Sequence, residues 1–169
     1  MKIEVKYGLY TGLGICAWRI AEHFLGFTST KLYIGQYSRV FAILLPIVMI
    51  PIAIREKRDA ELGGEIVLYD GVKCGVTIAT IFGAITAAFF FIYQTYINPD
   101  YLAHLIEFER IRMVADGIAQ NGITEKVDAM RTMNSFPWLV VFQFVGAIIS
   151  GLAISILATA ILKRKSARA

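Results

Sequence analysis

Three polar side chains interrupt the first long apolar segment of the sequence. The segment CAWRIAEHFLGF, residues 16–27, carries Arg19, Glu22 and His23 among apolar residues. In a helix, residues three and four positions apart are neighbours on one face, so Glu22 and His23 would both adjoin Arg19. This face would present a cation, an anion and an imidazole whose charge can change near neutral pH. Such a set could bind a proton, an anion or a polar headgroup.

The cost of these charges in a membrane allows two interpretations. An unpaired arginine at the bilayer centre costs about 2.5–3.5 kcal/mol on insertion scales, and pairing of Arg19 with Glu22 would lower that cost. In the first interpretation, the charges mark the outer end of a short or tilted membrane helix, where long side chains reach the interface and Trp18 is suited to it. In the second, they form a buried polar site that faces other helices. The spacing allows both.

Other residue types that could carry chemistry form no catalytic or metal-binding pattern. Cys16 and Cys74 lack metal-ligand spacing, and His104 adds only a second histidine. No catalytic triad, carboxylate pair or nucleotide-binding fingerprint stands out. We therefore expect a protein that is not an enzyme, with no metal site and no cofactor. Residues that could approach Arg19 from other segments by interhelical hydrogen bonding are Tyr93, Gln94 and Gln143.

The composition indicates that the chain contacts a lipid bilayer. Hydrophobic residues make up 57% of the 169 residues, and the mean hydropathy is +0.61. A single soluble core of this size cannot hide so much apolar surface. The apolar residues also gather in blocks and not in amphipathic stripes. The net charge of +4 is not arranged as a basic face interleaved with aromatic residues, so we expect no nucleic-acid partner.

Four apolar segments are long enough to cross a membrane as helices, since about 20 residues span the ~30 Å hydrocarbon layer. The expected membrane helices cover about residues 7–27, 37–54, 72–97 and 138–162. Pro46 and Pro51 should bend the second of these. The predicted fold class is all-α, an integral membrane four-helix bundle that forms a single domain over residues 1–169.

A helical hairpin outside the cytoplasm is expected between the third and fourth membrane helices, over about residues 99–135. Asn98 and Pro99 are typical of a helix cap and a first helical position. Thr124 is the expected cap of the second helix, which should end near Met133. The hairpin could cap the bundle or bind a partner.

The distribution of lysine and arginine predicts that both termini are cytoplasmic. Ten basic residues would then lie inside: Lys2, Lys6, Arg55, Lys57, Arg58, Lys73, Lys163, Arg164, Lys165 and Arg168. Six would lie outside: Lys31, Arg39, Arg110, Arg112, Lys126 and Arg131. The N-terminal segment is interpreted as an uncleaved signal anchor.

Small residues recur every four positions in two of the expected membrane helices. In the third helix they are Gly71, Gly75, Ala79, Gly83 and Ala87. In the fourth they are Ala147, Gly151, Ser155 and Thr159, and a shorter pair in the first helix is Gly8 and Gly12. Such stripes let helix backbones approach closely in lipid. They predict a compact bundle, with a homodimer seam as the alternative.

An ordered set of segments resembles a bacterial family. The segments are RDAELGGEIVLYDGVKCG, a long apolar helix that ends in INPDYL, NGITEKVDAM, and FVGAIISGLAISILATAILKRK. They include the Gly63–Gly64 pair and Pro99. The chain is similar in these respects to the domain-of-unknown-function family DUF4199. The resemblance implies a small four-helix protein of the bacterial inner membrane without an established activity, and it implies no catalytic residues.

Two functional hypotheses follow. In the first, the chain is a non-enzymatic structural or accessory subunit of a membrane or envelope assembly, and its hairpin or a small-residue face docks a partner. This hypothesis predicts co-purification with another membrane protein and little effect of Glu22→Gln on folding. In the second, the chain is a small proton- or anion-linked transporter or sensor that uses Arg19, Glu22 and His23, as a dimer. This hypothesis predicts pH-dependent transport or binding that Glu22→Gln or His23→Ala abolishes.

Overall fold

The structure is a computed structural model that describes residues 1–163, apart from the side chain of Arg39. Over these residues the chain forms helices and connecting loops, and no strand. This confirms that the fold class is all-α. Three of the basic residues used above to predict orientation, Arg164, Lys165 and Arg168, lie outside the described residues.

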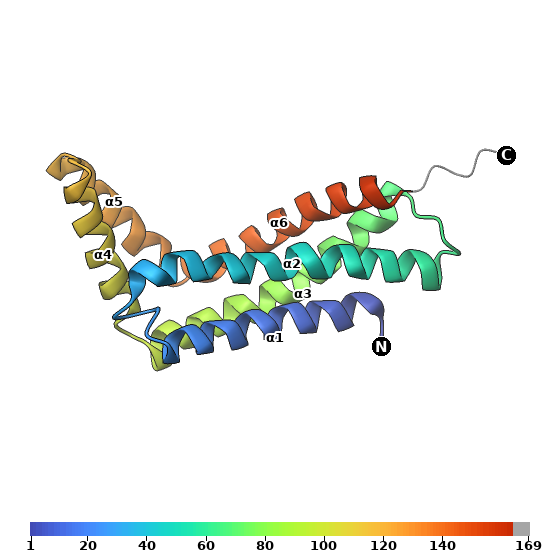
Figure 1. The fold of residues 1–169 in the computed structure, drawn as a ribbon, viewed down its shortest axis with the longest axis horizontal. Helices are drawn as coiled ribbons and strands as arrows, with labels where there is room; N and C mark the ends of the chain where they lie inside the picture. Colours follow the sequence, from blue (N-terminus) through green and yellow to red (C-terminus); the bar gives the residue numbers. More distant parts are fainter. Residues whose placement is uncertain (164–169) are drawn as a thin grey trace.

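The molecule has a body of long helices and an arm of shorter ones. The helical body consists of α1 (Ile3–Phe24), α2 (Leu32–Glu61), α3 (Leu68–Ile92) and α6 (Trp138–Leu162). The arm consists of α4 (Tyr101–Ala115) and α5 (Gln120–Met133), and a π-helical turn, η1 (Tyr93–Ile97), follows α3. Figure 1 shows the body helices side by side, with the arm projecting from one end. The N-terminus and the end of α6 lie at the opposite end, which we call the basal end (Figure 1).

Within the described residues, three helical segments are long and apolar enough to cross a membrane. They are Leu32–Glu61, Leu68–Ile97 and Trp138–Leu162. These segments contain the second, third and fourth apolar blocks of the sequence. α1 does not meet the same criterion because Arg19, Glu22 and His23 lower the hydropathy of its apolar segment.

The first three body helices differ in their bounds from the apolar blocks that predict them. α1 begins at Ile3 and ends at Phe24, where residues 7–27 were expected. α2 covers Leu32–Glu61, where residues 37–54 were expected, and α3 begins at Leu68, before the expected start at residue 72. Hydropathy marks only the apolar part of a helix, whereas the flanking lysine, arginine and glutamate residues are themselves good helix formers. The helical hydrogen bonding of α2 continues past both of its prolines, Pro46 and Pro51.

Both arm helices begin at residues other than those predicted. α4 begins at Tyr101, so the predicted cap Asn98 lies outside it. The Asn98 amide instead donates to two hydroxyl groups inside the fold, and tertiary hydrogen bonding thus replaces local capping. α5 begins at Gln120, and the predicted cap Thr124 lies within this helix. Its hydroxyl donates to the carbonyl oxygen of Gln120, as threonine often does inside helices.

The two stripes of small residues meet in the contact between α3 and α6. The opposed pairs are Gly71 with Thr159, Gly75 with Ser155, Ala79 with Gly151, and Gly83 with Ala147. The pairing is antiparallel, and both stripes are buried. A Cβ atom added at Gly83 would lie 2.9 Å from the Cβ of Ala147, closer than real side chains approach. The small residues therefore allow the close backbone contact that stabilises helix pairs in lipid, and they are not exposed to a second copy.

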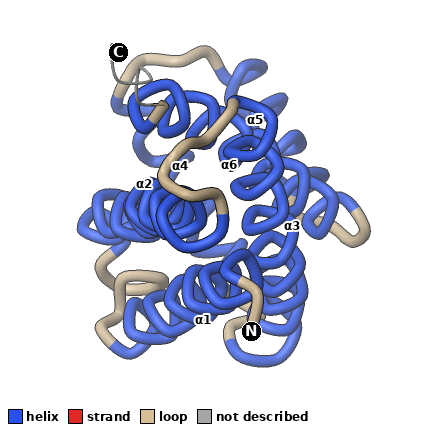
Figure 2. The backbone as a smooth tube through the Cα atoms, turned by 90° about the vertical axis from the view of Figure 1, so that its right-hand side faces the viewer, coloured by secondary structure: helices blue, strands red, loops and turns tan. Residues whose placement is uncertain are grey.

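Glycines also bring α1 against α3. A Cβ atom at Gly8 would lie 2.7 Å from Ile81, and one at Gly12 would lie 3.0 Å from Ile85. Figure 2 views the body from its basal end and shows α2 and α3 on opposite sides, between α1 and α6. α1 and α6 are therefore diagonal to each other, and each packs against both α2 and α3.

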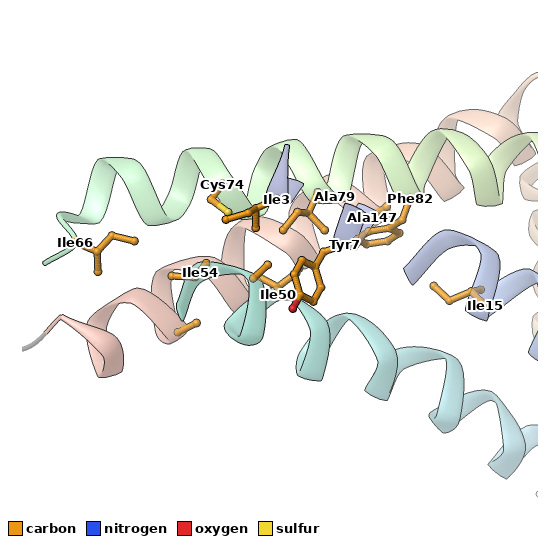
Figure 3. Close-up of a cluster of buried hydrophobic side chains, with 13 residues drawn as sticks. Ile3, Tyr7, Ile15, Ile50, Ile54, Ile66, Cys74, Ala79, Phe82 and Ala147 are labelled. Atoms are coloured by element: carbon orange, nitrogen blue, oxygen red, sulfur yellow. The ribbon is translucent and has the colours of Figure 1, made fainter. Parts of the chain in front are cut away.

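Buried apolar side chains fill the space between the body helices. Figure 3 shows them distributed along the body from Ile66 near the basal end to Ile15 in α1. Ile50, Ile54 and Ile78 are completely buried. At the basal end, charged residues join the helices: Lys6 donates to Glu56 at 2.8 Å. The apolar core and this polar contact both hold α1 on α2.

Candidate functional site

Arg19 and Glu22 form an ion pair inside the helical body. Nη1 of Arg19 donates to Oε2 of Glu22 at 2.8 Å, and the two residues are only 9% and 2% exposed. Nε1 of Trp18 donates to Oε1 of Glu22 at 3.1 Å, and the hydroxyl of Ser38 in α2 donates to the same oxygen. Three donors thus satisfy a carboxylate that is out of contact with water. The pair thus contacts residues of neighbouring helices, and it also lies in the last two turns of α1.

The guanidinium of Arg19 also holds the base of the arm. Its Nη2 donates to the hydroxyl of Tyr101, the first residue of α4, at 3.3 Å. The Cζ atom of Arg19 lies 5.0 Å from the ring centre of Phe90, 5.2 Å from that of Tyr101 and 6.0 Å from that of Tyr93. Aromatic rings at such distances stabilise a cation through their negative faces. Arg19 therefore connects α1 to α3, η1 and α4.

His23 belongs to a separate polar cluster. Its Nδ1 lies 3.3 Å from the Tyr93 hydroxyl and 3.5 Å from the Thr28 hydroxyl. Tyr93 donates to Thr28 at 3.1 Å, and the amide of Asn98 donates to Tyr93 at 3.1 Å. Successive residues of a helix are rotated by about 100°, so Glu22 and His23 lie on opposite sides of Arg19. The three predicted site residues are therefore split between two clusters: Arg19 and Glu22 in one, and His23 in the other. Tyr93 contacts both, since its ring lies beside Arg19 and its hydroxyl lies beside His23.

The other residues predicted to approach Arg19 have different positions. Tyr93 does reach it, as described above. The amide of Gln94 instead donates to Asn134, in the turn after α5, at 3.3 Å. Gln143 lines a cavity that also reaches Arg19. His104 is exposed on α4 and belongs to neither polar cluster.

Several residues of the two clusters could not be identified from the sequence. Ser38 is a single hydroxyl residue with no local pattern that links it to Glu22. Thr28 is the first of three consecutive hydroxyl residues and lies five positions after His23, which is not the spacing of neighbours on a helix face. Tyr101 is a member of the apolar face of α4, and nothing in its spacing indicates a bond to a residue in α1. The sequence provides one general indication: a buried charge in a membrane helix requires polar partners, which often come from other segments. It does not indicate which residues these partners are.

A lateral cavity of about 580 Å³ lies beside the Arg19–Glu22 pair. Residues from four helices line it: Ile15, Trp18, Arg19 and Glu22 of α1; Ala42, Ile43, Pro46 and Ile47 of α2; Phe82, Thr86 and Phe90 of α3; and Gln143, Gly146, Ala147, Ser150, Ala153 and Ile154 of α6. Most of the lining is apolar. The cavity falls within the roughly 300–1,000 Å³ of ligand pockets, which also combine apolar walls with a few polar groups.

The described residues contain no group of three or more histidine, cysteine, aspartate or glutamate side chains that could hold a metal ion. Cys16 and Cys74 are free thiols in α1 and α3. The candidate site consists of the buried Arg19–Glu22 ion pair, the aromatic and hydroxyl side chains that contact it, and the lateral cavity.

Comparison with known proteins finds a family that matches nearly the whole chain. The model of the family described as "Protein of unknown function (DUF4199)" matches residues 6–164. Neither the curated proteins nor the solved structures contain a match. The family match confirms the resemblance found in the ordered sequence segments.

Proposed function

We propose that this chain, which belongs to the DUF4199 family of proteins of unknown function, is a non-enzymatic structural or accessory subunit of a membrane or envelope assembly. In this proposal the helical body is a membrane-spanning four-helix bundle, and the arm is a helical hairpin outside the membrane. The membrane is the bacterial inner membrane, with both termini on the cytoplasmic side. The arm then presents a docking surface on the outer side.

The burial of its charges supports α1 as the fourth membrane helix. Arg19 and Glu22 are paired with each other and buried among neighbouring helices, so they would not face the bulk hydrocarbon of the bilayer. Its exposed large hydrophobic residues include Tyr10, Leu13 and Phe24. A helix can therefore present an apolar surface to lipid although its mean hydropathy is too low to indicate a membrane span.

The position of basic residues supports a cytoplasmic basal end. Seven basic residues lie in the parts of the chain at or near the basal end: Lys2, Lys6, Arg55, Lys57, Arg58, Lys73 and Lys163. Arg19 and Arg39 lie in the parts of α1 and α2 that are nearer the arm. Short segments rich in lysine and arginine remain on the cytoplasmic side of inner-membrane proteins. The arm, at the other end, carries acidic as well as basic residues.

The observation that carries the docking role is the contact between Arg19 and Tyr101. A buried cation of α1 is bonded to the first residue of α4, so the body holds the base of the arm in place. The arm itself is largely exposed and carries apolar side chains near the turn between its helices. Ile111, Val114 and Ile118 are 62%, 59% and 42% exposed. Exposed apolar residues gathered on one element are typical of protein interaction sites.

The test is co-purification from the native membrane after gentle detergent extraction, with the retained proteins identified by mass spectrometry. We expect a membrane protein partner to co-purify with the wild-type chain and its recovery to fall about tenfold or more with Ile111→Ser, since a central apolar contact can supply that much binding energy. Thr132→Ser, at an exposed position of α5, is the matched control and should retain the partner. Equal recovery in both variants, or no membrane protein with the wild type, would contradict the docking role.

A second candidate function is a small proton- or anion-linked transporter or sensor. The observation that favours it is the hydrogen-bonded set His23, Tyr93, Thr28 and Asn98, which joins α1 to η1 at the arm end of the body. Proton or anion flux into liposomes that contain the purified chain would test it across a range of pH. Flux that is abolished by His23→Ala and by Glu22→Gln would support this function, and an inert wild-type protein would exclude it.

A further inference from the structure

We infer that the lateral cavity holds one acyl chain of a phospholipid from the surrounding bilayer, with the oxygen atoms of that lipid beside Arg19 and Gln143. The inference rests on the membrane location proposed above, but it does not depend on the docking role of the arm. Three observations carry it: the distribution of polar side chains in the cavity, the position of its opening and its volume.

The charged and amide side chains that line the cavity gather toward the arm, whereas the hydroxyl residues Thr86 and Ser150 lie along its length. Arg19 and Glu22, in the last two turns of α1, and Gln143, in the second turn of α6, lie toward the arm. Ile15 and Ile154 lie farther from the arm along the same helices. A phospholipid of the leaflet on the arm side has the same polarity, with its oxygen atoms toward that surface and its chains toward the bilayer centre.

The polar end of the cavity contains donors that suit ester and phosphate oxygens. A guanidinium group has five N–H donors, and the bonds of Arg19 to Glu22 and Tyr101 start from Nη1 and Nη2. The side-chain amide of Gln143 supplies two further N–H groups. Arg19 and Glu22 are the charged lining residues, and their charges cancel, so the cavity does not require a ligand of high net charge.

The cavity opens sideways between α2 and α6. The exposed lining residues come from these two helices and include Ile43, Ile47, Gly146 and Ser150. A Cβ atom built at Gly146 meets no other atom within 4 Å, so this part of α6 borders open space. In a membrane-spanning body this opening faces hydrocarbon, and a lipid chain can enter it without crossing water.

The cavity suits a narrow occupant better than a helix of a second protein or of a second copy. A helix with its side chains is about 10–12 Å wide, and it needs several turns to reach the depth of the cavity, which has a volume of about 580 Å³. An extended acyl chain is narrow enough to lie in the space.

The experiment is native mass spectrometry of the full chain released from nanodiscs of phosphatidylethanolamine and phosphatidylglycerol. The wild-type chain should retain one phospholipid. Gly146→Phe should fill the cavity and reduce retention about tenfold or more, since each methylene group excluded from burial weakens binding about fourfold. Ser150→Leu fills the cavity more mildly and is a second blocking variant. Ile149→Phe is the matched control, because Ile149 is exposed on α6 but does not line the cavity.

Loss of the lipid from both blocking variants, with retention by Ile149→Phe, would support the inference. Equal lipid retention in all folded variants would overturn it. A wild-type chain that inserts into nanodiscs but carries no bound phospholipid after its release from them would also overturn it. Retention of a free fatty acid or another small molecule in place of a phospholipid would also overturn it. Failure of the wild-type chain to insert at all would instead refute the membrane location.

Discussion

At the scale of single residues, the chain is organised around a buried charge pair, Arg19 and Glu22. Arg19 receives compensation from Glu22, from the Tyr101 hydroxyl and from three aromatic rings. Glu22 is satisfied by donors from its own helix and from α2. A buried ion pair does not by itself make a protein more stable, but removal of one partner leaves a buried charge without compensation.

The first residue-scale prediction concerns Glu22→Gln. The variant keeps the side-chain volume but leaves Arg19 buried without its anion, so the free energy of unfolding should fall by about 3 kcal/mol. This expected loss differs from the little effect on folding that the accessory-subunit hypothesis predicted from the sequence, because the structure buries Glu22 against Arg19. Denaturant titration in detergent micelles would measure the change, with Glu125→Gln at an exposed position of α5 as control.

A double variant sharpens the same prediction. Adding Arg19→Met to Glu22→Gln removes the uncompensated cation, so part of the lost free energy of unfolding should return. If Glu22→Gln and Glu125→Gln have the same denaturant midpoint of unfolding, then loss of the Glu22 charge does not destabilise the fold.

At the scale of elements, the contact between α3 and α6 depends on how closely their backbones approach. Gly75 faces Ser155, and a Cβ atom at Gly75 would lie 2.7 Å from the Cβ of Ser155 and 3.1 Å from Ile50. Neighbours on both sides leave little room for movement. By contrast, Gly146 on the same helix as Ser155 borders open space.

Gly75→Ala should therefore lower the free energy of unfolding by about 1–3 kcal/mol, the usual effect of overpacking. Gly146→Ala should be neutral or slightly stabilising, because alanine is the better helix former and meets no neighbour. Addition of Ser155→Gly to Gly75→Ala should restore part of the stability by making room on the facing helix. Thermal unfolding in the same detergent would compare the four proteins. Equal effects of the two alanine variants would show that close approach at Gly75 is not required.

At the scale of the whole molecule, the body and the arm define two ends with different chemistry. The basal end carries the N-terminus, the end of α6 and most basic residues of the body. The Arg19 and His23 clusters lie toward the arm end, and the lateral cavity extends from the Arg19 cluster toward the middle of the body. In a membrane, these ends would face opposite compartments.

Cysteine labelling tests this orientation. In a background of Cys16→Ala and Cys74→Ala, Thr124→Cys should react with a membrane-impermeant maleimide applied outside intact spheroplasts, because Thr124 is exposed on α5. Lys2→Cys should react only after the membrane is disrupted, because Lys2 lies at the basal end. Labelling of Lys2→Cys from outside, with protection of Thr124→Cys, would reverse the proposed orientation.

Some features followed from the sequence because they depend on local composition and spacing. The all-α class follows from apolar blocks that are long enough to cross a membrane as helices. One of these helices, α6, has the predicted bounds, Trp138–Leu162. The register of small residues was visible because side chains four positions apart share a helix face. Family membership followed from the order of several segments along nearly the whole chain.

Only the tertiary structure decided what the polar residues contact. The sequence placed Arg19, Glu22 and His23 together, but the partners Ser38 and Tyr101 come from other segments, and no local spacing encodes such distant contacts. The cavity also depends on how four helices diverge around Arg19, which no single helix specifies. Hydropathy and helical periodicity act within a segment, whereas burial, ion pairing and open space are properties of segments packed together.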